Sequence, residues 1–230
     1  MNIAIILSGG TGTRMGLSIP KQYVEVNGIP VIQYCLKTLL GHKMVDMAVI
    51  AVADEWQDFV QQCVDRLSPK IPVYYSQPGD TRQGSIINAL KVTKQKGAKD
   101  NDIVLIHDAA RPLLSASLAA DCINACKDAD AVLPVIPAKD TIYLSRDGQH
   151  IDSLLERKTL WNGQAPEAFR FGSYYEANMN LTQDQIKLIT GSTEVSYRAG
   201  LKCVLIPGDP ANFKITTQED LSNFQAIVNK

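Results

Sequence analysis

The sequence has few of the features that mark membrane, secreted or nucleic-acid-binding proteins. No apolar run approaches the roughly 20 residues that a helix needs to span a bilayer. The segment that starts at Met1 has no basic leader and is too short for a signal-peptide core with a cleavage site. The formal net charge is -1 over 230 residues, so no overall basic field favours nucleic acid. We therefore expect a cytoplasmic protein that binds neither a membrane nor nucleic acid.

Cysteine is also scarce, with 5 residues that are odd in number and scattered through apolar stretches. Cys122 and Cys126 are spaced to share a helix face, but no second Cys or His pair completes a zinc set. This pattern favours reduced, buried thiols in a cytosolic protein. The cysteines are Cys35, Cys63, Cys122, Cys126 and Cys203.

The composition is otherwise that of a globular protein. Hydrophobic residues make up 45% of the chain and charged residues 20%, which are ordinary values for a chain with a real core. The length suits one large domain with at most a small appendage.

Short apolar runs alternate with segments of helical periodicity over the first part of the chain. Strands alternating with helices at this spacing predict a three-layer α/β/α sandwich on a mostly parallel sheet. The expected strands are 3–7, 47–52, 73–76 and 102–107, and the expected helices are 30–40, 55–67, 84–94 and about 115–127.

The pattern changes after the next expected strand, 131–137. Residues 141–144 and 150–155 flank Asp147-Gly148 and resemble a hairpin, in an excursion too long for an ordinary connection. We expect a β-arm at about 138–160 that projects from a single domain spanning 1–230. Strands at 203–207 and 213–216 and a helix from Gln218 complete the chain.

The loop after the first strand predicts a phosphate-binding site. Residues 8–16 carry four glycines, which let the backbone turn sharply and direct its N–H groups at an anion. Arg14 and Lys21 add cations suited to a triphosphate. A dinucleotide-binding G-x-G-x-x-G is excluded because Met15 stands where its third glycine belongs, and no P-loop motif is present. An ordinary glycine turn is the alternative.

Read together, G-G-x-G-x-R-M-G and the following P-K-Q-Y resemble the opening signature of nucleotidyltransferases that activate sugars and polyols. Within that superfamily the sequence is most similar to the 2-C-methyl-D-erythritol 4-phosphate cytidylyltransferase family, with the ribitol 5-phosphate cytidylyltransferases as close relatives. The resemblance extends over essentially the whole chain. It implies a Rossmann-like nucleotidyltransferase fold, CTP as substrate, Mg²⁺ as cofactor and a homodimer with exchanged arms.

The same resemblance assigns a nucleotide site to three loops. In the family, the backbone of Gly79-Asp80 and the side chain of Ser85 read the edge of the cytosine, although residues 78–85 could also be a simple helix cap. The residues implied to bind the nucleotide are Leu7, Ser8, Gly9, Gly10, Gly12, Thr13, Arg14, Lys21, Gly79, Asp80, Ser85 and Ala109.

A carboxylate ends the strand at 102–107 and suits Mg²⁺, which takes oxygen ligands and is usually shared with phosphates. By resemblance Asp108 holds the metal, and Arg157 reaches across a dimer, although chemistry alone would make Arg157 a surface charge. Asp108 could instead cap the next helix, Lys214 could be an exposed strand lysine, and we expect His107 to be structural. The implied acceptor-binding residues are Asp108, Arg111, Thr141, Arg157, Thr190 and Lys214.

The implied reaction needs no protein nucleophile. An oxygen of the acceptor phosphate attacks the α-phosphorus of CTP, and pyrophosphate leaves. Catalysis is then positioning and charge neutralisation, with Arg14, Lys21 and Lys214 as the catalytic residues.

The resemblance weakens around the acceptor. Gly191 stands where relatives usually carry an acid, a carboxylate follows only at Glu194, and Ala165 replaces a threonine. We expect 2-C-methyl-D-erythritol 4-phosphate as acceptor, for isoprenoid precursor synthesis. The alternatives are ribitol 5-phosphate, or another polyol or hydroxy-acid phosphate for cell-surface polysaccharide. A non-catalytic nucleotide-binding subunit and a transferase for another nucleotide also remain open.

Overall fold

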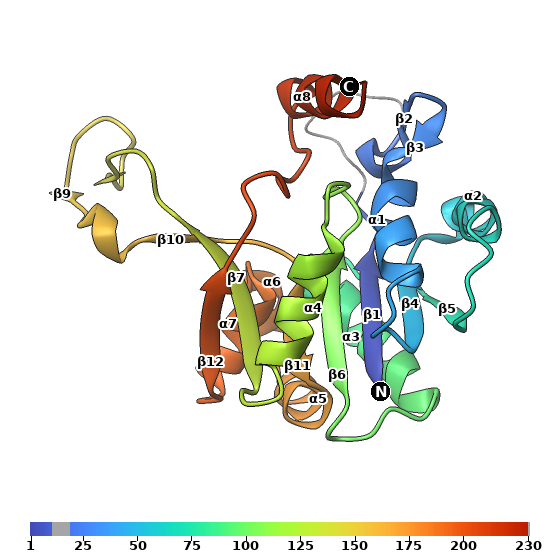
Figure 1. Ribbon diagram of the computed structural model, residues 1–230. Helices are drawn as coiled ribbons and strands as arrows, with labels where there is room; N and C mark the ends of the chain where they lie inside the picture. The colour runs from blue at the N-terminus through green and yellow to red at the C-terminus, as the bar shows by residue number, and fades with distance from the viewer. Residues whose placement is uncertain (11–18, 230) are drawn as a thin grey trace.

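The computed structural model describes residues 1–10 and 19–229, and a mixed sheet of eight strands forms its centre. Strand order is β10-β7-β11-β6-β1-β4-β5, with β12 paired to β7 (Figure 1). The pairs β5–β4, β4–β1, β1–β6 and β7–β12 are parallel, whereas β10 and β11 run antiparallel to their neighbours. The strands are β1 (Asn2–Leu7), β4 (Met47–Ala51), β5 (Val73–Ser76), β6 (Ile103–Asp108), β7 (Ala131–Pro137), β10 (Trp161–Gly163), β11 (Glu167–Arg170) and β12 (Cys203–Pro207).

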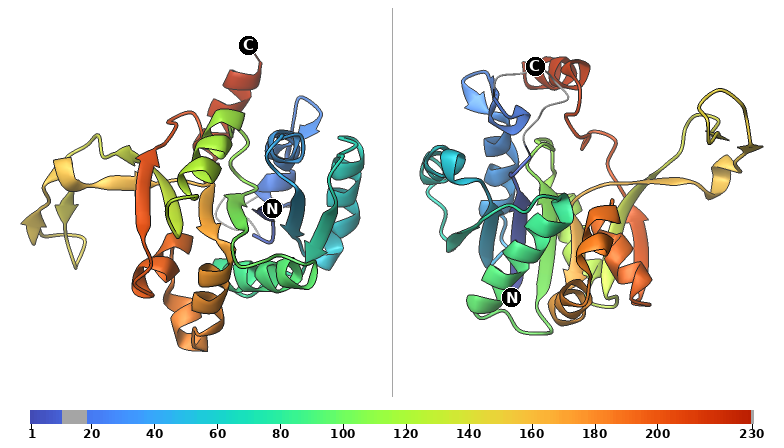
Figure 2. Two further views of the ribbon diagram at one scale, coloured as in Figure 1. Left: turned by 60° about the horizontal axis from the view of Figure 1, so that its bottom comes forward. Right: turned by 180° about the vertical axis from the view of Figure 1, so that it is seen from behind.

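Helices cover both faces of this sheet (Figures 1 and 2). Successive side chains of a strand point to opposite faces. Ala4 and Ile6 of β1 accordingly join one buried cluster, and Ile3 and Ile5 join the other. The first face carries α1 (Val31–Leu40), α2 (Asp54–Asp65) and α4 (Ala116–Ala125), and the second carries α3 (Arg82–Gln95), α5 (Phe171–Met179), α6 (Gln183–Leu188) and α7 (Ser192–Arg198). The predicted three-layer α/β fold is confirmed.

A third, smaller cluster lies above the carboxyl ends of the strands. There the last helix, α8 (Gln218–Val228), packs through Leu221 and Phe224 against the start of α1 and the short hairpin of β2 (Glu25–Val26) and β3 (Ile29–Pro30). Figure 1 shows α8 above the sheet. This packing holds the segment before α8 over the edge of the sheet where the candidate site lies.

The prediction of a strand at 213–216 was wrong, because these residues form an irregular segment. Ile215 is fully buried beside Phe224, and its N–H donates to the carbonyl of Ala110. The apolar residues here serve packing under α8, and they pair with no strand.

Two further differences concern the second half of the chain. The sequence did not predict β11, which lies antiparallel between β6 and β7, nor the helices α5 to α7 that follow it. The expected hairpin strands are shorter than predicted, since only β8 (Tyr143–Leu144) and β9 (Ser153–Leu154) pair.

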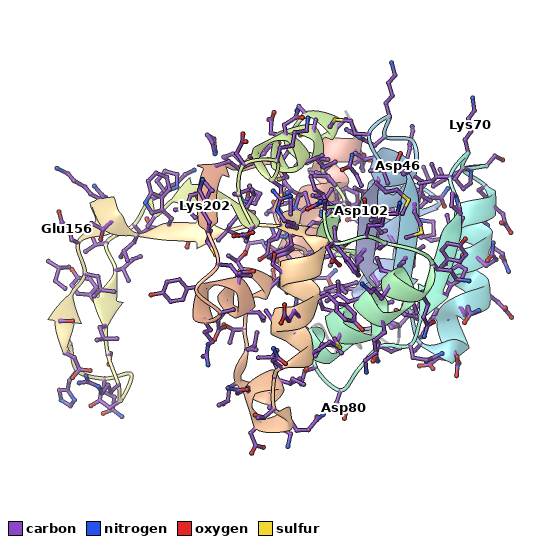
Figure 3. All side chains as sticks on the ribbon, turned by 90° about the horizontal axis from the view of Figure 1, so that it is seen from below. Asp46, Lys70, Asp80, Asp102, Glu156 and Lys202 are labelled. Atoms are coloured by element: carbon purple, nitrogen blue, oxygen red, sulfur yellow. The ribbon has the colours of Figure 1, made fainter. Side chains whose placement is uncertain are left out.

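Residues 138–160 form an extended arm that stands away from the sheet and helices (Figures 1 and 2). In Figure 3 the labelled Glu156 lies on this arm, on the opposite side of the molecule from Lys70. Several apolar side chains of the arm are exposed, among them Tyr143, Ile151 and Leu154 at 55%, 67% and 64%.

In the described part of the chain, none of the helices has both the length and the apolar character to cross a membrane. Four of the cysteines are buried and Cys203 is partly buried, and all are free thiols. Burial raises the pKa of Cys35, Cys122 and Cys126 to about 12, which keeps these thiols protonated and unreactive.

Candidate active site

Two adjoining cavities open at the edge of the sheet where β1, β4, β5 and β6 end. The larger has a volume of about 640 Å³ and the smaller about 280 Å³. Arg82, Asp108 and Lys214 line both cavities. The carboxyl end of a parallel sheet is where open α/β folds bind their ligands.

The loop after β1 forms one wall of the larger cavity and is held by η2 (Lys21–Tyr23). The amide of Gln22 donates to the carbonyls of Ser8 and Gly10, both at 2.7 Å. The hydroxyls of Ser8 and Tyr23 lie 2.8 Å apart. Leu7, Ser8, Gly9, Gly10 and Lys21 all line the cavity. Of the expected nucleotide-binding residues, Gly12, Thr13 and Arg14 lie outside the described residues.

The loop between β5 and α3 forms the facing wall. A Cβ on Gly9 would lie 2.4 Å from Cβ of Pro78, and one on Gly79 would lie 2.6 Å from the carbonyl carbon of Gly84. Only glycine allows these two close approaches: the first packs the loop after β1 against the side chain of Pro78, and the second brings the loop between β5 and α3 back onto the start of α3.

Thr81 caps α3 by accepting a hydrogen bond from the N–H of Gly84 at 3.0 Å. The hydroxyl of Ser85 accepts from the N–H of Gly79 at 3.0 Å and donates to the carbonyl of Thr81. Ser85 therefore shapes the loop as well as lining the cavity. Asp80 is exposed at the rim of the cavity, where Figure 3 shows it at the margin of the molecule.

Ala109 does not line either cavity. It is buried, and its N–H donates to the carbonyl of Leu7, while its neighbour Ala110 lines the larger cavity. His107 is also buried, with Nε2 3.0 Å from the carbonyl of Arg111. Burial lowers the pKa of His107 to about 4, so its ring is neutral at pH 7.

Three cations converge on Asp108 at the end of β6. Arg82 Nε lies 3.0 Å from Oδ1, Lys214 Nζ lies 2.9 Å from Oδ2, and Arg111 Nε lies 3.7 Å from Oδ2. Burial alone would raise the pKa of Asp108, but Arg82, Lys214 and Arg111 together hold it well below its usual range. Asp108 is thus an anion surrounded by positive charge.

This environment bears on the expected metal ligand. Both carboxylate oxygens of Asp108 already face cations, and a metal ion there would have to displace at least one of them. Within residues 1–10 and 19–229, no group of three or more His, Cys, Asp or Glu side chains could hold a metal ion. In the described part of the chain, Asp108 is therefore better suited to holding the neighbouring Arg and Lys side chains in place than to binding a metal ion.

The smaller cavity contains most of the expected acceptor-binding residues. Arg111, which donates from Nη1 to the carbonyl of Asn212 at 2.7 Å, lines it together with Thr190 and Lys214. The backbone N–H and hydroxyl of Thr190 donate to Oε2 of Glu194 at 3.0 and 3.2 Å. Relatives usually carry an acid at position 191, whereas this chain has its carboxylate at Glu194, and that carboxylate holds Thr190 in place.

Two of the expected acceptor residues lie elsewhere in the chain. Thr141 and Arg157 are exposed on the arm and line neither cavity of their own chain. Arg157 donates from Nη1 to the carbonyl of Lys139 at 3.0 Å, a contact within the arm. A single chain thus brings neither residue into the lining of the candidate site.

The sequence analysis gave no role to Arg82, Glu167, Ser192 or Thr193. Glu167 of β11 is 6% exposed and accepts hydrogen bonds from Ser192 and Thr193 at the start of α7. Arg82 stands between Glu167 and Asp108. The position of Arg82 directly after the loop at 78–81 was the available signal, but its partners are far away in the sequence.

Comparison with known proteins places this geometry in a family. Residues 2–230 match a family model described as IspD: 2-C-methyl-D-erythritol 4-phosphate cytidylyltransferase. The chain is 33% identical over 228 residues to the 2-C-methyl-D-erythritol 4-phosphate cytidylyltransferase of Clostridium botulinum (strain Eklund 17B / Type B), covering 99% of both chains. It is 30% identical over 234 residues to the ribitol-5-phosphate cytidylyltransferase of Streptococcus pneumoniae serotype 2, covering 100% of both.

Solved structures give the same result. A crystal structure of 4-diphosphocytidyl-2C-methyl-D-erythritol synthase superposes with a TM-score of 0.80 at 27% identity, covering 99% of this chain and 98% of that one. The 2-C-methyl-D-erythritol 4-phosphate cytidylyltransferase of Francisella tularensis also has a TM-score of 0.80, at 25% identity, covering 97% of this chain and 99% of its own.

Proposed function

The chain belongs to the 2-C-methyl-D-erythritol 4-phosphate cytidylyltransferase family, and we propose that it transfers the cytidylyl group of CTP to 2-C-methyl-D-erythritol 4-phosphate. One observation carries the proposal. A cavity built from two glycine loops adjoins a smaller cavity with Arg111 and Thr190, and Lys214 lines both. A nucleoside triphosphate in the first and a phosphorylated acceptor in the second would meet at Lys214.

In the reaction, an oxygen of the acceptor phosphate attacks the α-phosphorus of CTP. The bond between the α-phosphorus and the bridging oxygen breaks, and pyrophosphate leaves with the electron pair. Lys21 at the nucleotide cavity, together with Arg14, neutralises charge on the triphosphate. Lys214 and Arg111 hold the acceptor phosphate, and no protein side chain forms a covalent bond.

Magnesium is part of the proposal as a companion of the triphosphate. Mg²⁺ is commonly held in such enzymes by substrate phosphates with one or two carboxylates, and it supplies neutralisation of phosphate charge. Among the described residues Asp108 is the one carboxylate that lines both cavities, but its oxygens face Arg82 and Lys214. We therefore assign no step to an ion held by the protein.

Ribitol 5-phosphate is the second candidate acceptor, because the ribitol-5-phosphate cytidylyltransferase of S. pneumoniae is similar over its whole length. A Cβ added at Gly191, which lines the smaller cavity, would meet no atom within 4 Å in the part of the chain that the structure describes. The region where the sequence departs from its relatives therefore opens the acceptor side of the site.

We also propose a homodimer with exchanged arms, working in the cytoplasm. Exposed Tyr143, Ile151 and Leu154 on the arm would be buried against a second copy. Exchange would also bring Thr141 and Arg157 to the partner's acceptor cavity, whereas they line neither cavity of their own chain. Free, buried thiols suit a reducing compartment.

A panel assay tests the acceptor. Pyrophosphate release is measured with Mg²⁺ and CTP against 2-C-methyl-D-erythritol 4-phosphate, ribitol 5-phosphate, erythritol 4-phosphate and glycerol 3-phosphate. We expect the highest kcat/KM with the first compound, a loss of at least about 100-fold in Lys21→Ala, and no release in EDTA. A preference for ribitol 5-phosphate would reject the proposed acceptor. CTP binding without release for any compound would favour a non-catalytic nucleotide-binding subunit.

A further inference from the structure

Arg82 occupies an unusual place between the two cavities. It is the first residue of α3, directly after the loop that faces the nucleotide cavity, and its side chain is 28% exposed. It lines both cavities, as only Asp108 and Lys214 also do among the residues described. Its position alone makes it part of the wall that separates the two substrates.

The guanidinium of Arg82 is held from three directions. Nε lies 3.0 Å from Asp108 at the end of β6, Nη1 donates to the hydroxyl of Ser192 on α7 at 2.6 Å, and Nη2 lies 3.5 Å from Glu167 on β11. The guanidinium is a rigid, planar fork, so three partners on three elements fix its orientation. Burial alone would lower the pKa of Arg82, but Asp108 and Glu167 raise it, so the charge is permanent.

Glu167 is itself fixed and buried. Its Oε1 accepts from the hydroxyl of Ser192 at 2.8 Å, and its Oε2 accepts from the N–H and hydroxyl of Thr193 at 2.8 and 2.6 Å. A neutral glutamine would keep one acceptor oxygen for Thr193, and its NH2 group would donate to the hydroxyl of Ser192 instead of accepting from it. A buried carboxylate is costly unless a cation faces it, and Arg82 is the cation here.

Acidic and basic side chains therefore alternate in a series of ion pairs at the site. Glu167, Arg82, Asp108 and Lys214 follow each other with distances of 3.5, 3.0 and 2.9 Å. This series begins at Glu167, in the wall of the acceptor cavity, and ends at Lys214, which lines both cavities. Displacement of Arg82 would remove one of the groups that fix the Asp108 carboxylate, so the position of Lys214 on its other oxygen would be less well defined.

We propose that Glu167 and Ser192 act as positioning residues, which fix Arg82 so that Asp108 and Lys214 are set for the acceptor phosphate. The inference rests on the proposed function, because it assigns the smaller cavity to a phosphorylated acceptor. It adds residues of β11 and α7, two elements outside the nucleotide loops, to the determinants of acceptor affinity.

The test separates this role from simple attachment of α7. Glu167→Gln keeps the size of the side chain, and its amide oxygen can still accept from the N–H and hydroxyl of Thr193 while its NH2 group donates to the hydroxyl of Ser192, but it removes the charge that faces Arg82. We expect the KM for 2-C-methyl-D-erythritol 4-phosphate to rise about tenfold, with kcat changed less than about threefold and the Kd for CTP within about twofold. Arg82→Lys should raise the same KM, because an ammonium cannot reach three partners in one plane.

Tyr174→Phe is the matched control. The Tyr174 hydroxyl donates to the backbone carbonyl of Ser192 at 3.2 Å, so its loss loosens the start of α7 without touching the ion pair. Tyr174 is buried and lines neither cavity. We expect the acceptor KM of this variant to stay within about twofold of wild type. Thermal unfolding of each variant checks that it is folded.

The results distinguish a failure of the positioning role from a failure of the proposed cytidylyltransferase activity. An unchanged acceptor KM in Glu167→Gln, or an equal loss of CTP and acceptor affinity, would overturn the positioning role while the enzyme remains a cytidylyltransferase. A rise in KM in Tyr174→Phe as large as in Glu167→Gln would show attachment of α7 alone and would also overturn it. A wild-type chain that turns over no polyol phosphate would overturn the proposed function, and the inference with it.

Discussion

Asp108 holds together the cationic side chains of the site. Arg82, Arg111 and Lys214 come from three different parts of the chain, and at these distances they would repel each other without a common anion. One carboxylate at the end of β6 therefore keeps three cations clustered where phosphates would bind. The sequence predicted the position of Asp108 at the sheet edge, but not that it is fully engaged by cations.

His107, next to Asp108, gives a prediction about stability and pH. Its pKa is lowered from 6.5 to about 4 by burial, so below pH 6.5 the unfolded chain binds a proton that the folded chain does not. Stability therefore falls as the pH drops from 6.5 towards 4. Between pH 7 and pH 5 we expect this residue to remove about 2 kcal/mol from the free energy of unfolding.

Urea unfolding at the two pH values measures the effect. His107→Gln cannot titrate and keeps a donor for the carbonyl of Arg111. Its free energy of unfolding should therefore fall less between pH 7 and pH 5 than that of wild type, by the amount that His107 contributes. Equal losses in the two proteins would show that the ring of His107 is not held neutral.

At the scale of elements, the two glycine loops show how local structure builds the nucleotide cavity. Gly79→Ala would place a Cβ 2.6 Å from the carbonyl carbon of Gly84 and 2.9 Å from the nitrogen of Ser85. These are backbone atoms at the start of α3, so the loop itself must shift. We expect the Kd for CTP to rise at least about tenfold, with stability reduced by about 1–3 kcal/mol.

Calorimetric titration with CTP checks this prediction. Gly10→Ala is the comparison, because a Cβ there would meet no atom of the described residues within 4 Å, and its effect should be the smaller of the two. CTP affinity unaffected in Gly79→Ala would mean that this loop does not shape the nucleotide site.

The elements also show what a sequence can reveal. Strands β1, β4, β5 and β6 and the helices α1 to α3 between them were predicted because each buried parallel strand is a short apolar run and each helix has an apolar face. β11 was missed because it has only four residues and its ends are Glu167 and Arg170, whose partners lie on other elements. The strand expected at 213–216 was wrong because burial of Ile215 under α8 imitates the apolar pattern of a strand.

The same limit applies to the site. Residues inside contiguous motifs, such as Gly79 and Lys214, could be named from the sequence. Arg82 is 26 residues from Asp108, 85 from Glu167 and 110 from Ser192 along the chain, so only the folded structure brings the four together.

At the scale of the whole molecule, the arm leads to a prediction about assembly. Exposed apolar residues on a projecting segment suit a contact with a second copy, and closed two-fold dimers are the commonest oligomers. We expect light scattering to give twice the mass of the chain. A fully active monomer would contradict the dimer.

Mixing two variants tests the exchange of arms. Arg157→Ala and Lys214→Ala should each be nearly inactive alone. In a mixed dimer with exchanged arms, one of the two sites has both native residues, so random mixing should restore about a quarter of wild-type activity. No restoration, in a mixture shown to contain mixed dimers, would mean that Arg157 does not serve the partner's site.

Cytidylyl transfer is the central step proposed for this protein, and phosphorus NMR of the reaction mixture measures that step directly. With CTP, Mg²⁺ and 2-C-methyl-D-erythritol 4-phosphate, we predict that free pyrophosphate and a diphosphate joining cytidine to the polyol appear together, in equal amounts, and that UTP and ATP do not replace CTP. Release of pyrophosphate with CMP as the only other product, or transfer from UTP or ATP in preference to CTP, would contradict the account.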